Sequence, residues 1–188
     1  MLLALALVAI AALVGVTLAL RTSLERERRL ARTDVVTGVR SARAFYEAAA
    51  MEIERSRRYP HAFSVACVDL GTRVGDELLR STAAALRGAL RATDLIARLG
   101  RDEFIVLMPE TPAAATKIVL EKLRTGLLDV RTGDGRQMST SIGGVTFVEP
   151  PAGIDDIVRA ADERITDAKA TGAVSHITWN AAPPADGR

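Results

Sequence analysis

The chain has 188 residues, of which 48% are hydrophobic, and this is enough for one domain with a buried core. Its net charge of +2 argues against bulk binding of nucleic acid, and no nucleic-acid partner is expected. One cysteine, Cys67, and two histidines far apart, His61 and His176, exclude a disulfide framework and a His- or Cys-based zinc site. A magnesium ion held by carboxylates remains compatible with this composition.

The first twenty residues form an apolar run without a single charge. A helix of that length spans about 30 Å, the thickness of a bilayer core. The arginines of residues 21–32 follow this run and mark the cytoplasmic side. A cleaved signal peptide is the alternative, but it has a basic start and a shorter apolar segment. We expect a single-pass protein of the inner (cytoplasmic) membrane whose domain faces the cytoplasm, which agrees with the lone cysteine.

Four segments are predicted in chain order, namely a transmembrane helix over 1–20, a charged juxtamembrane helical linker over 21–33, a folded domain over 34–180 and a disordered tail over 181–188. Within the domain, periodicity predicts helices over 42–58, 76–90, 112–128 and 154–171. Strands are predicted over 62–70, 95–99, 103–109, 137–148 and 174–179. Over residues 62–148, the order βαββαβ is typical of an antiparallel sheet with helices on one face. Gly143 and Gly144 are expected to serve strand packing rather than a phosphate loop.

Carboxylates occur at the ends of two predicted strands. Asp69 ends one apolar strand, and Asp102 and Glu103 lie at the turn of a hairpin. These strands can be neighbours in such a sheet, so the three side chains could converge on Mg²⁺ for phosphoryl or nucleotidyl transfer. An aspartate at a strand end is also a common turn residue or helix cap, and spacing alone leaves both interpretations open.

Several segments in order resemble the GGDEF family, the diguanylate cyclases. Residues 98–104 (RLGRDEF) resemble its R-x-G-G-D-E-F hairpin, and residues 34–39 (DVVTGV) resemble its opening D-x-L-T-G-L. Residues 139–143 (STSIG) and 161–172 (ADERITDAKATG) resemble its T-x-S-I-G strand and its last helix. The likeness covers about residues 30–180. It implies an α+β fold with a ferredoxin-like βαββαβ core, in which a central antiparallel sheet is flanked by helices.

The resemblance also implies a reaction. Two such domains face each other, each holding one GTP, and form cyclic di-GMP and two pyrophosphates, so a homodimer or a pair with another GGDEF protein is expected. It assigns Mg²⁺ as cofactor, with Asp69 and Asp102 as metal ligands. Asp102 and Glu103 are the catalytic candidates. It also implies three substrate-binding residues: Asp76 on guanine, Lys169 on phosphate, and Gly100 in the hairpin.

This sequence departs from the family pattern in the substrate-binding positions. Only six residues separate Asp69 from Asp76, where the family has roughly ten more, and the missing stretch carries a phosphate-binding Lys and a guanine-reading Asn. Arg73 could replace the lost charge. Arg101 stands at the second hairpin glycine, where it could resist a backbone shape that glycine allows or could attract phosphate. Losing several charge-assisted contacts, at about 1.5–3 kcal/mol each, predicts weak or absent cyclase activity.

A second site is indicated by residues 91–94 (RATD), an R-x-x-D placed like the family's product-binding inhibitory site. Arg91 and Asp94 are therefore candidates for binding cyclic di-GMP, and a surface Arg–Asp pair is the alternative. The leading hypothesis is a membrane-anchored, degenerate GGDEF protein that acts as a cyclic di-GMP receptor or regulator. An active diguanylate cyclase that binds GTP and a ligand-free interaction scaffold are the two alternatives.

Overall fold

The computed structural model describes residues 14–16, 32–71, 74–133, 135–136, 138–172 and 174–179. The chain divides into two units, Met1–Ala31 and Arg32–Arg188, and only the second is described at length. Within the described ranges, no helix is long and apolar enough to cross a bilayer. The predicted membrane helix over 1–20 lies outside the described residues except for residues 14–16, which are helical. The tail over 181–188 and most of the linker over 21–33 also lie outside them.

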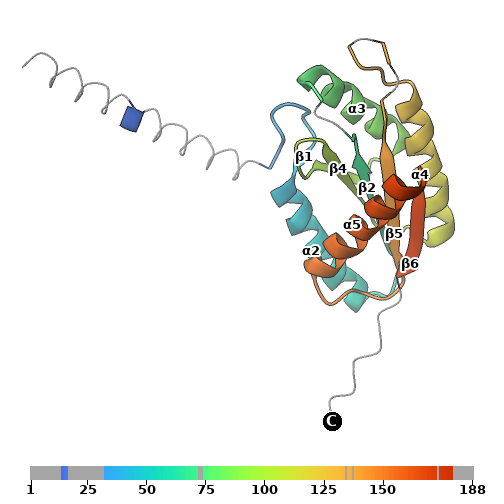
Figure 1. Ribbon diagram of the computed structural model, residues 1–188. Coiled ribbons are helices and arrows are strands. Elements are labelled where there is room, and N and C mark those ends of the chain that lie inside the picture. The colour runs from blue at the N-terminus through green and yellow to red at the C-terminus, as the bar shows by residue number, and fades with distance from the viewer. Residues whose placement is uncertain are drawn as a thin grey trace, which may run out of the picture. The chain divides into compact units, whose positions relative to one another are not determined.

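Six strands form a single sheet in the order β1-β3-β4-β2-β5-β6 (Figure 1). Neighbouring strands among β3, β4, β2 and β5 are antiparallel, whereas β1 pairs with β3 and β6 pairs with β5 in parallel. The prediction of an antiparallel sheet is therefore right for the centre and wrong at both edges. β6 runs parallel because a helix crosses over between it and β5. The strands are β1 Arg40–Ser41, β2 Phe63–Asp69, β3 Leu95–Arg98, β4 Glu103–Met108, β5 Ser141–Phe147 and β6 Ser175–Trp179.

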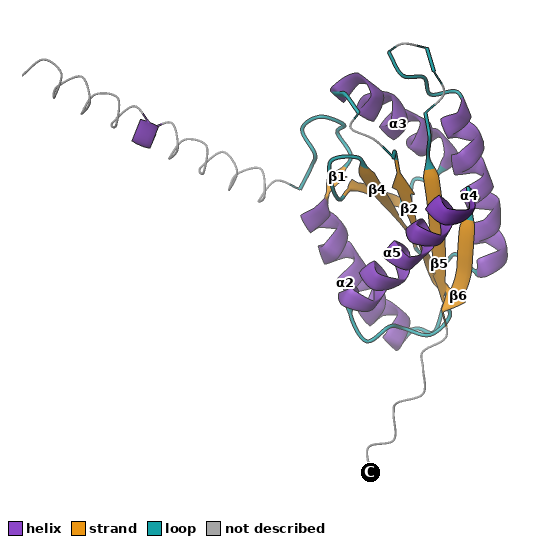
Figure 2. Ribbon diagram, in the orientation of Figure 1, coloured by secondary structure: helices purple, strands orange, loops and turns teal. Residues whose placement is uncertain are grey.

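Helices cover both faces of this sheet, and the prediction of helices on one face is wrong (Figure 2). Helices α2 and α5 pack on one face, and α3 and α4 pack on the other. The reason lies in the central strands, which are buried on both sides. In β2, Phe63 and Val65 enter one core while Ala66 and Val68 enter the other. The helices are α2 Ala42–Arg58, α3 Asp76–Ala89, α4 Ala113–Leu128 and α5 Ile154–Thr171.

The bounds of the four helices agree with the predicted ranges to within one residue. At its start, Ser41 caps α2 by accepting a hydrogen bond from the amide of Ala44 at 3.4 Å. At its end, α5 is closed by Gly172 in the left-handed conformation, with φ of 67°, as the sequence predicts. The short strand β1 was not predicted, and β5 begins only at Ser141 rather than at residue 137.

Two glycines in β5 let helices approach the sheet from opposite sides. A Cβ atom at Gly143 would lie 2.6 Å from the Cβ of Arg164 on α5 and 2.8 Å from the backbone nitrogen of Ile165. A Cβ at Gly144 would lie 2.6 Å from Leu120 Cδ1 on α4. The expectation that this glycine pair serves packing is confirmed. The close contact at Gly143 matters for the site, because α5 carries Lys169 toward the end of β2.

Candidate functional site

Strand register brings the predicted carboxylates together. Asp69 at the end of β2 pairs directly with Glu103 at the start of β4. The amide of Leu70 donates to the carbonyl oxygen of Asp102 at 3.0 Å, which ties the end of β2 to the hairpin. Side chains from both strands and from α5 then line one small cavity of about 270 Å³. Its lining residues are Asp69, Gly71, Arg101, Asp102, Glu103 and Lys169.

The carboxylates of this pocket differ in their hydrogen-bond partners and in the charges around them. Lys169 Nζ donates to Asp69 Oδ2 at 2.7 Å, and the other oxygen of Asp69 accepts the amide of Gly71 at 2.8 Å. The pKa of Glu103 is raised above its ordinary value, first by burial and then by the negative charges of Asp69 and Asp162. Positive charge from Lys169 offsets part of that effect. Crowded negative charge is thus only partly neutralised by this chain's own residues.

Carboxylate oxygens of this kind are hard ligands that suit Mg²⁺. Among the described residues, no group of three or more His, Cys, Asp or Glu side chains is arranged to hold a metal ion by itself. Mg²⁺ in nucleotide sites is commonly held by one or two carboxylates, with waters and substrate phosphates completing the shell. Asp69 and Asp102 fit this role as a pair, because both line the cavity and the crowding around Glu103 leaves negative charge for a cation to neutralise.

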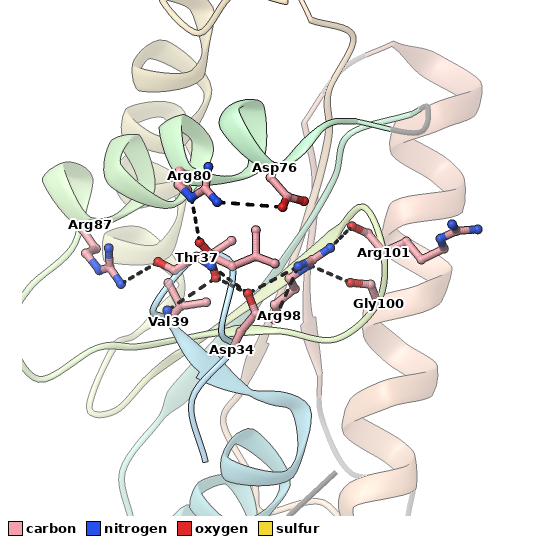
Figure 3. Close-up of polar contacts among 10 residues, drawn as sticks. Asp34, Thr37, Val39, Asp76, Arg80, Arg87, Arg98, Gly100 and Arg101 are labelled. Carbon is pink, nitrogen blue, oxygen red and sulfur yellow. Dashed lines mark hydrogen bonds and ion pairs between the residues drawn. The ribbon is translucent and has the colours of Figure 1, made fainter. Parts of the chain in front are cut away.

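The side chain of Arg98 holds the hairpin loop that carries Asp102. Its Nε donates to the carbonyl of Gly100 at 3.0 Å and its Nη2 donates to the carbonyl of Arg101 at 2.7 Å (Figure 3). Its Nη1 lies 3.3 Å from Asp34 Oδ1, which also accepts from the amide and hydroxyl of Thr37. The contact between Asp34 and Arg98 was not predicted from the sequence. The opposite charges of these two residues, one in each motif, were the available signal.

Asp34 titrates below its ordinary range because of these contacts. Partial burial acts to raise the pKa of Asp34, but the hydrogen bonds from Thr37 and the positive charge of Arg98 outweigh burial, so the net pKa is lowered. Asp34 is therefore ionised when it holds Arg98, which in turn holds the hairpin loop. The same aspartate accepts from Thr37 in the turn that contains Gly38, whose φ is 67°.

Arg101 does not strain the hairpin backbone, contrary to one expectation from the sequence. Among the described residues other than glycine, only Glu110 has a positive φ, so Arg101 occupies an ordinary conformation. Gly100 does meet a close neighbour. A Cβ atom there would lie 3.1 Å from Glu103 Oε2, so the glycine leaves room for that carboxylate.

Asp76 is the candidate that the structure does not bring to the carboxylate pocket. It lies in the first turn of α3 with 64% of its side chain exposed, and its nearest charged partner is Arg80, at 3.8 Å. It does not line the cavity around Asp69 and Asp102. Residues 72 and 73 lie outside the described residues, so the predicted substitute Arg73 has no described position.

The R-x-x-D segment lies at a second, larger cavity of about 590 Å³, within the usual 300–1,000 Å³ of small-molecule sites. Three arginines from different elements line it: Arg40 of β1, Arg87 of α3 and Arg91. Asp94 Oδ2 accepts the amide of Arg91 at 2.8 Å, so the two residues are joined through the backbone rather than as a side-chain ion pair. The other oxygen of Asp94 is buried and has no hydrogen-bond partner.

Comparison with known proteins agrees with this geometry. The family model described as "Diguanylate cyclase, GGDEF domain" matches residues 31–175. Diguanylate cyclase DgcP of Pseudomonas aeruginosa is 31% identical over 167 residues, which are 82% of this chain and 25% of that protein. Response regulator PleD of Caulobacter vibrioides is 31% identical over 172 residues, 81% of this chain and 37% of that protein. The chain therefore spans between a quarter and two fifths of the length of these relatives.

Solved structures share the fold as well. Diguanylate cyclase SiaD of Pseudomonas aeruginosa, solved with its activator SiaC, has a TM-score of 0.71 at 26% identity and covers 88% of this chain and 70% of its own. A sensory box/GGDEF family protein of Caulobacter crescentus has a TM-score of 0.66 at 28% identity and covers 76% of this chain and 100% of its own. Family model, relatives and fold agree, and the chain belongs to the GGDEF family.

Proposed function

We propose that this protein takes part in cyclic di-GMP signalling as a receptor or regulator, with weak or absent cyclase activity. The observation that carries the proposal is the cavity beside Arg91. Arg40, Arg87 and Arg91 line it together with Asp94, one of whose carboxylate oxygens is buried and has no hydrogen-bond partner. Arginine forks suit phosphates and guanine edges, and a carboxylate oxygen accepts from guanine N–H groups. Cyclic di-GMP offers both kinds of group.

The proposal of a degenerate active site rests on the other cavity. Its volume of about 270 Å³ lies below the usual range for a small-molecule site. Lys169, which the family resemblance assigns to phosphate, is paired with Asp69. Asp76, the proposed guanine ligand, is not part of the lining. A site that lacks buried polar partners for its substrate discriminates and binds poorly.

Residual diguanylate cyclase activity is the second candidate function, and one observation favours it. Asp69, Asp102, Glu103 and Lys169 line the same cavity, although they come from three different elements. In such a reaction, bound Mg²⁺ would neutralise charge that develops on the phosphate oxygens. Asp69 and Asp102 would hold that ion, and Lys169 would bind phosphate after its contact with Asp69 breaks. Glu103 would accept the proton of the ribose hydroxyl that attacks phosphorus as pyrophosphate leaves. Because each domain would carry one GTP, activity would require a homodimer or a second GGDEF protein.

We further propose that residues 1–20 anchor the domain to the inner membrane, with the domain on the cytoplasmic side. The uncharged apolar run and the arginines that follow it support this placement. In this arrangement the protein reads or relays cyclic di-GMP close to the membrane. If neither cavity binds a nucleotide, the fold would serve as an interaction scaffold.

Calorimetry on the 188-residue chain in detergent, with Mg²⁺, separates these functions. We expect cyclic di-GMP to bind the wild type and Arg91→Ala to bind it at least tenfold more weakly, because one or more charge-assisted hydrogen bonds are lost. Lys122→Ala removes a positive charge on α4, outside this cavity, and should bind normally. Failure of the wild type to bind cyclic di-GMP would refute the proposed receptor function.

The same preparation, incubated with GTP and Mg²⁺, tests the second candidate. Weak or absent formation of cyclic di-GMP is the expected result. Clear product that disappears in both Asp69→Ala and Asp102→Ala would instead establish a cyclase and refute the degenerate active site. Both variants remove a carboxylate of the small cavity and leave the arginine-lined cavity intact.

A further inference from the structure

Two positively charged side chains line the carboxylate pocket, and only one of them is paired. Lys169 Nζ is 2.7 Å from Asp69 Oδ2, and the side chain of Asp69 is only 10% exposed. Arg101 is exposed, and among the described residues its guanidinium has neither an ion pair nor a hydrogen bond. The charge of Lys169 is thus compensated inside the protein, whereas the charge of Arg101 is not.

The backbone under Arg101 is fixed although its side chain is free. Arg98 Nη2 holds the carbonyl of Arg101 at 2.7 Å, and Arg98 is itself held by Asp34. In Figure 3 the side chain of Arg101 extends away from the group around Asp34 and Arg98. A held backbone and an unpartnered fork cost little to organise around a ligand, because only side-chain freedom has to be lost.

The charge balance of the pocket determines which ligand this arginine fits. Asp69, Asp102 and Glu103 supply negative charge, so an anion enters only together with a divalent cation or another positive group. Mg²⁺ bound to a polyphosphate meets that condition. Part of the polyphosphate charge then remains, and a planar guanidinium can bind two phosphate oxygens at once.

We propose that Arg101 binds a phosphate group of a magnesium-bound nucleoside triphosphate in this pocket. The proposal rests on the second candidate function, in which the pocket retains nucleotide. Among the described residues that line the cavity, Arg101 is the cation that can bind phosphate without first breaking an ion pair, whereas Lys169 must leave Asp69 to do so. Arg101 then partly replaces the phosphate-binding Lys of the stretch that is missing between Asp69 and Asp76.

Titration of the 188-residue chain with Mg·GTP and with magnesium-bound inorganic triphosphate tests this role. We expect both probes to bind the wild type, and Arg101→Ala to bind both about tenfold more weakly or worse. Arg101→Lys should recover part of the affinity, because it restores the charge without the fork. Lys122→Ala, with one charge removed from α4 outside both cavities, should bind both probes like the wild type. Unchanged melting temperatures would show that each variant is folded.

Three results would overturn the proposal. Equal affinities of Arg101→Ala and wild type for both probes would remove Arg101 from the site while leaving the pocket's nucleotide binding intact. Loss of binding in Arg91→Ala instead would place the triphosphate in the arginine-lined cavity. No binding of either probe by the wild type would end both this inference and the candidate cyclase, whereas the receptor would still be judged by cyclic di-GMP alone.

Discussion

At the scale of single residues, the Asp34–Arg98 pair determines where the hairpin lies. Arg98 contacts the carbonyls of Gly100 and Arg101 directly, and Asp34 holds Arg98 from a turn 64 residues earlier. A partly buried ion pair thus supports the loop that presents Asp102 to the cavity.

Replacing Asp34 by asparagine removes the charge and keeps the shape. Because the pKa of Asp34 is lowered in the folded state, its ionisation stabilises the fold above the unfolded-state pKa, near pH 4, and this contribution disappears as the pH falls through the folded-state pKa. We expect Asp34→Asn to be less stable than the wild type by about 1 kcal/mol at pH 7. Urea unfolding at a series of pH values should show the two proteins converging in acid. A difference independent of pH would contradict the electrostatic account.

At the same scale, sequence reasoning found the residue types of the site but not all their contacts. Asp69, Asp102, Glu103 and Lys169 were assigned by motif, and they line one cavity. The contact of Lys169 with Asp69 was not predicted, because 100 residues separate the two and the packing of α5 on the sheet brings them together. Asp76 was assigned by the same motif logic, but the start of α3 keeps it out of the cavity lining.

At the scale of elements, α5 packs so closely on β5 that position 143 has no room for a side chain. A methyl group at Gly143 would collide with backbone atoms of α5, which cannot move as a flexible side chain does. We expect Gly143→Ala to lower the free energy of unfolding by about 1–3 kcal/mol, or more if α5 cannot shift. Displacement of α5 in this variant should also weaken the contact between Lys169 and Asp69.

Gly88→Ala provides the matched control, because it is the same substitution at an open position within α3. Nothing lies within 4 Å of a Cβ built there, and alanine favours a helix over glycine by about 0.5–1 kcal/mol. Thermal unfolding should therefore show Gly88→Ala equal to or more stable than the wild type. Similar losses in both variants would mean that the close packing at Gly143 is not the cause.

At the scale of the whole molecule, the proposed membrane anchor determines where the domain works. A charged residue at the centre of a spanning helix costs about 2.5–3.5 kcal/mol in insertion, so Val8→Arg together with Leu13→Arg should abolish anchoring. We expect the wild-type chain to stay with the membrane fraction after alkaline carbonate washing and the double variant to be released. Leu24→Arg, beyond the apolar run, is the control and should remain with the membrane. Release of the wild type would refute the anchor.

The sequence by itself determined the helices, most strands and the family, because local periodicity, caps and the order of motifs are written in consecutive residues. Gly172 ends α5 as predicted, and the hairpin follows residues 95–109 as predicted. Tertiary structure decided what depends on distant pairs: the parallel edge strands, the helices on both faces, the Asp34–Arg98 tie and the unequal pairing of Lys169 and Arg101. These outcomes come from packing and charge balance between residues far apart in the chain, which no local pattern encodes.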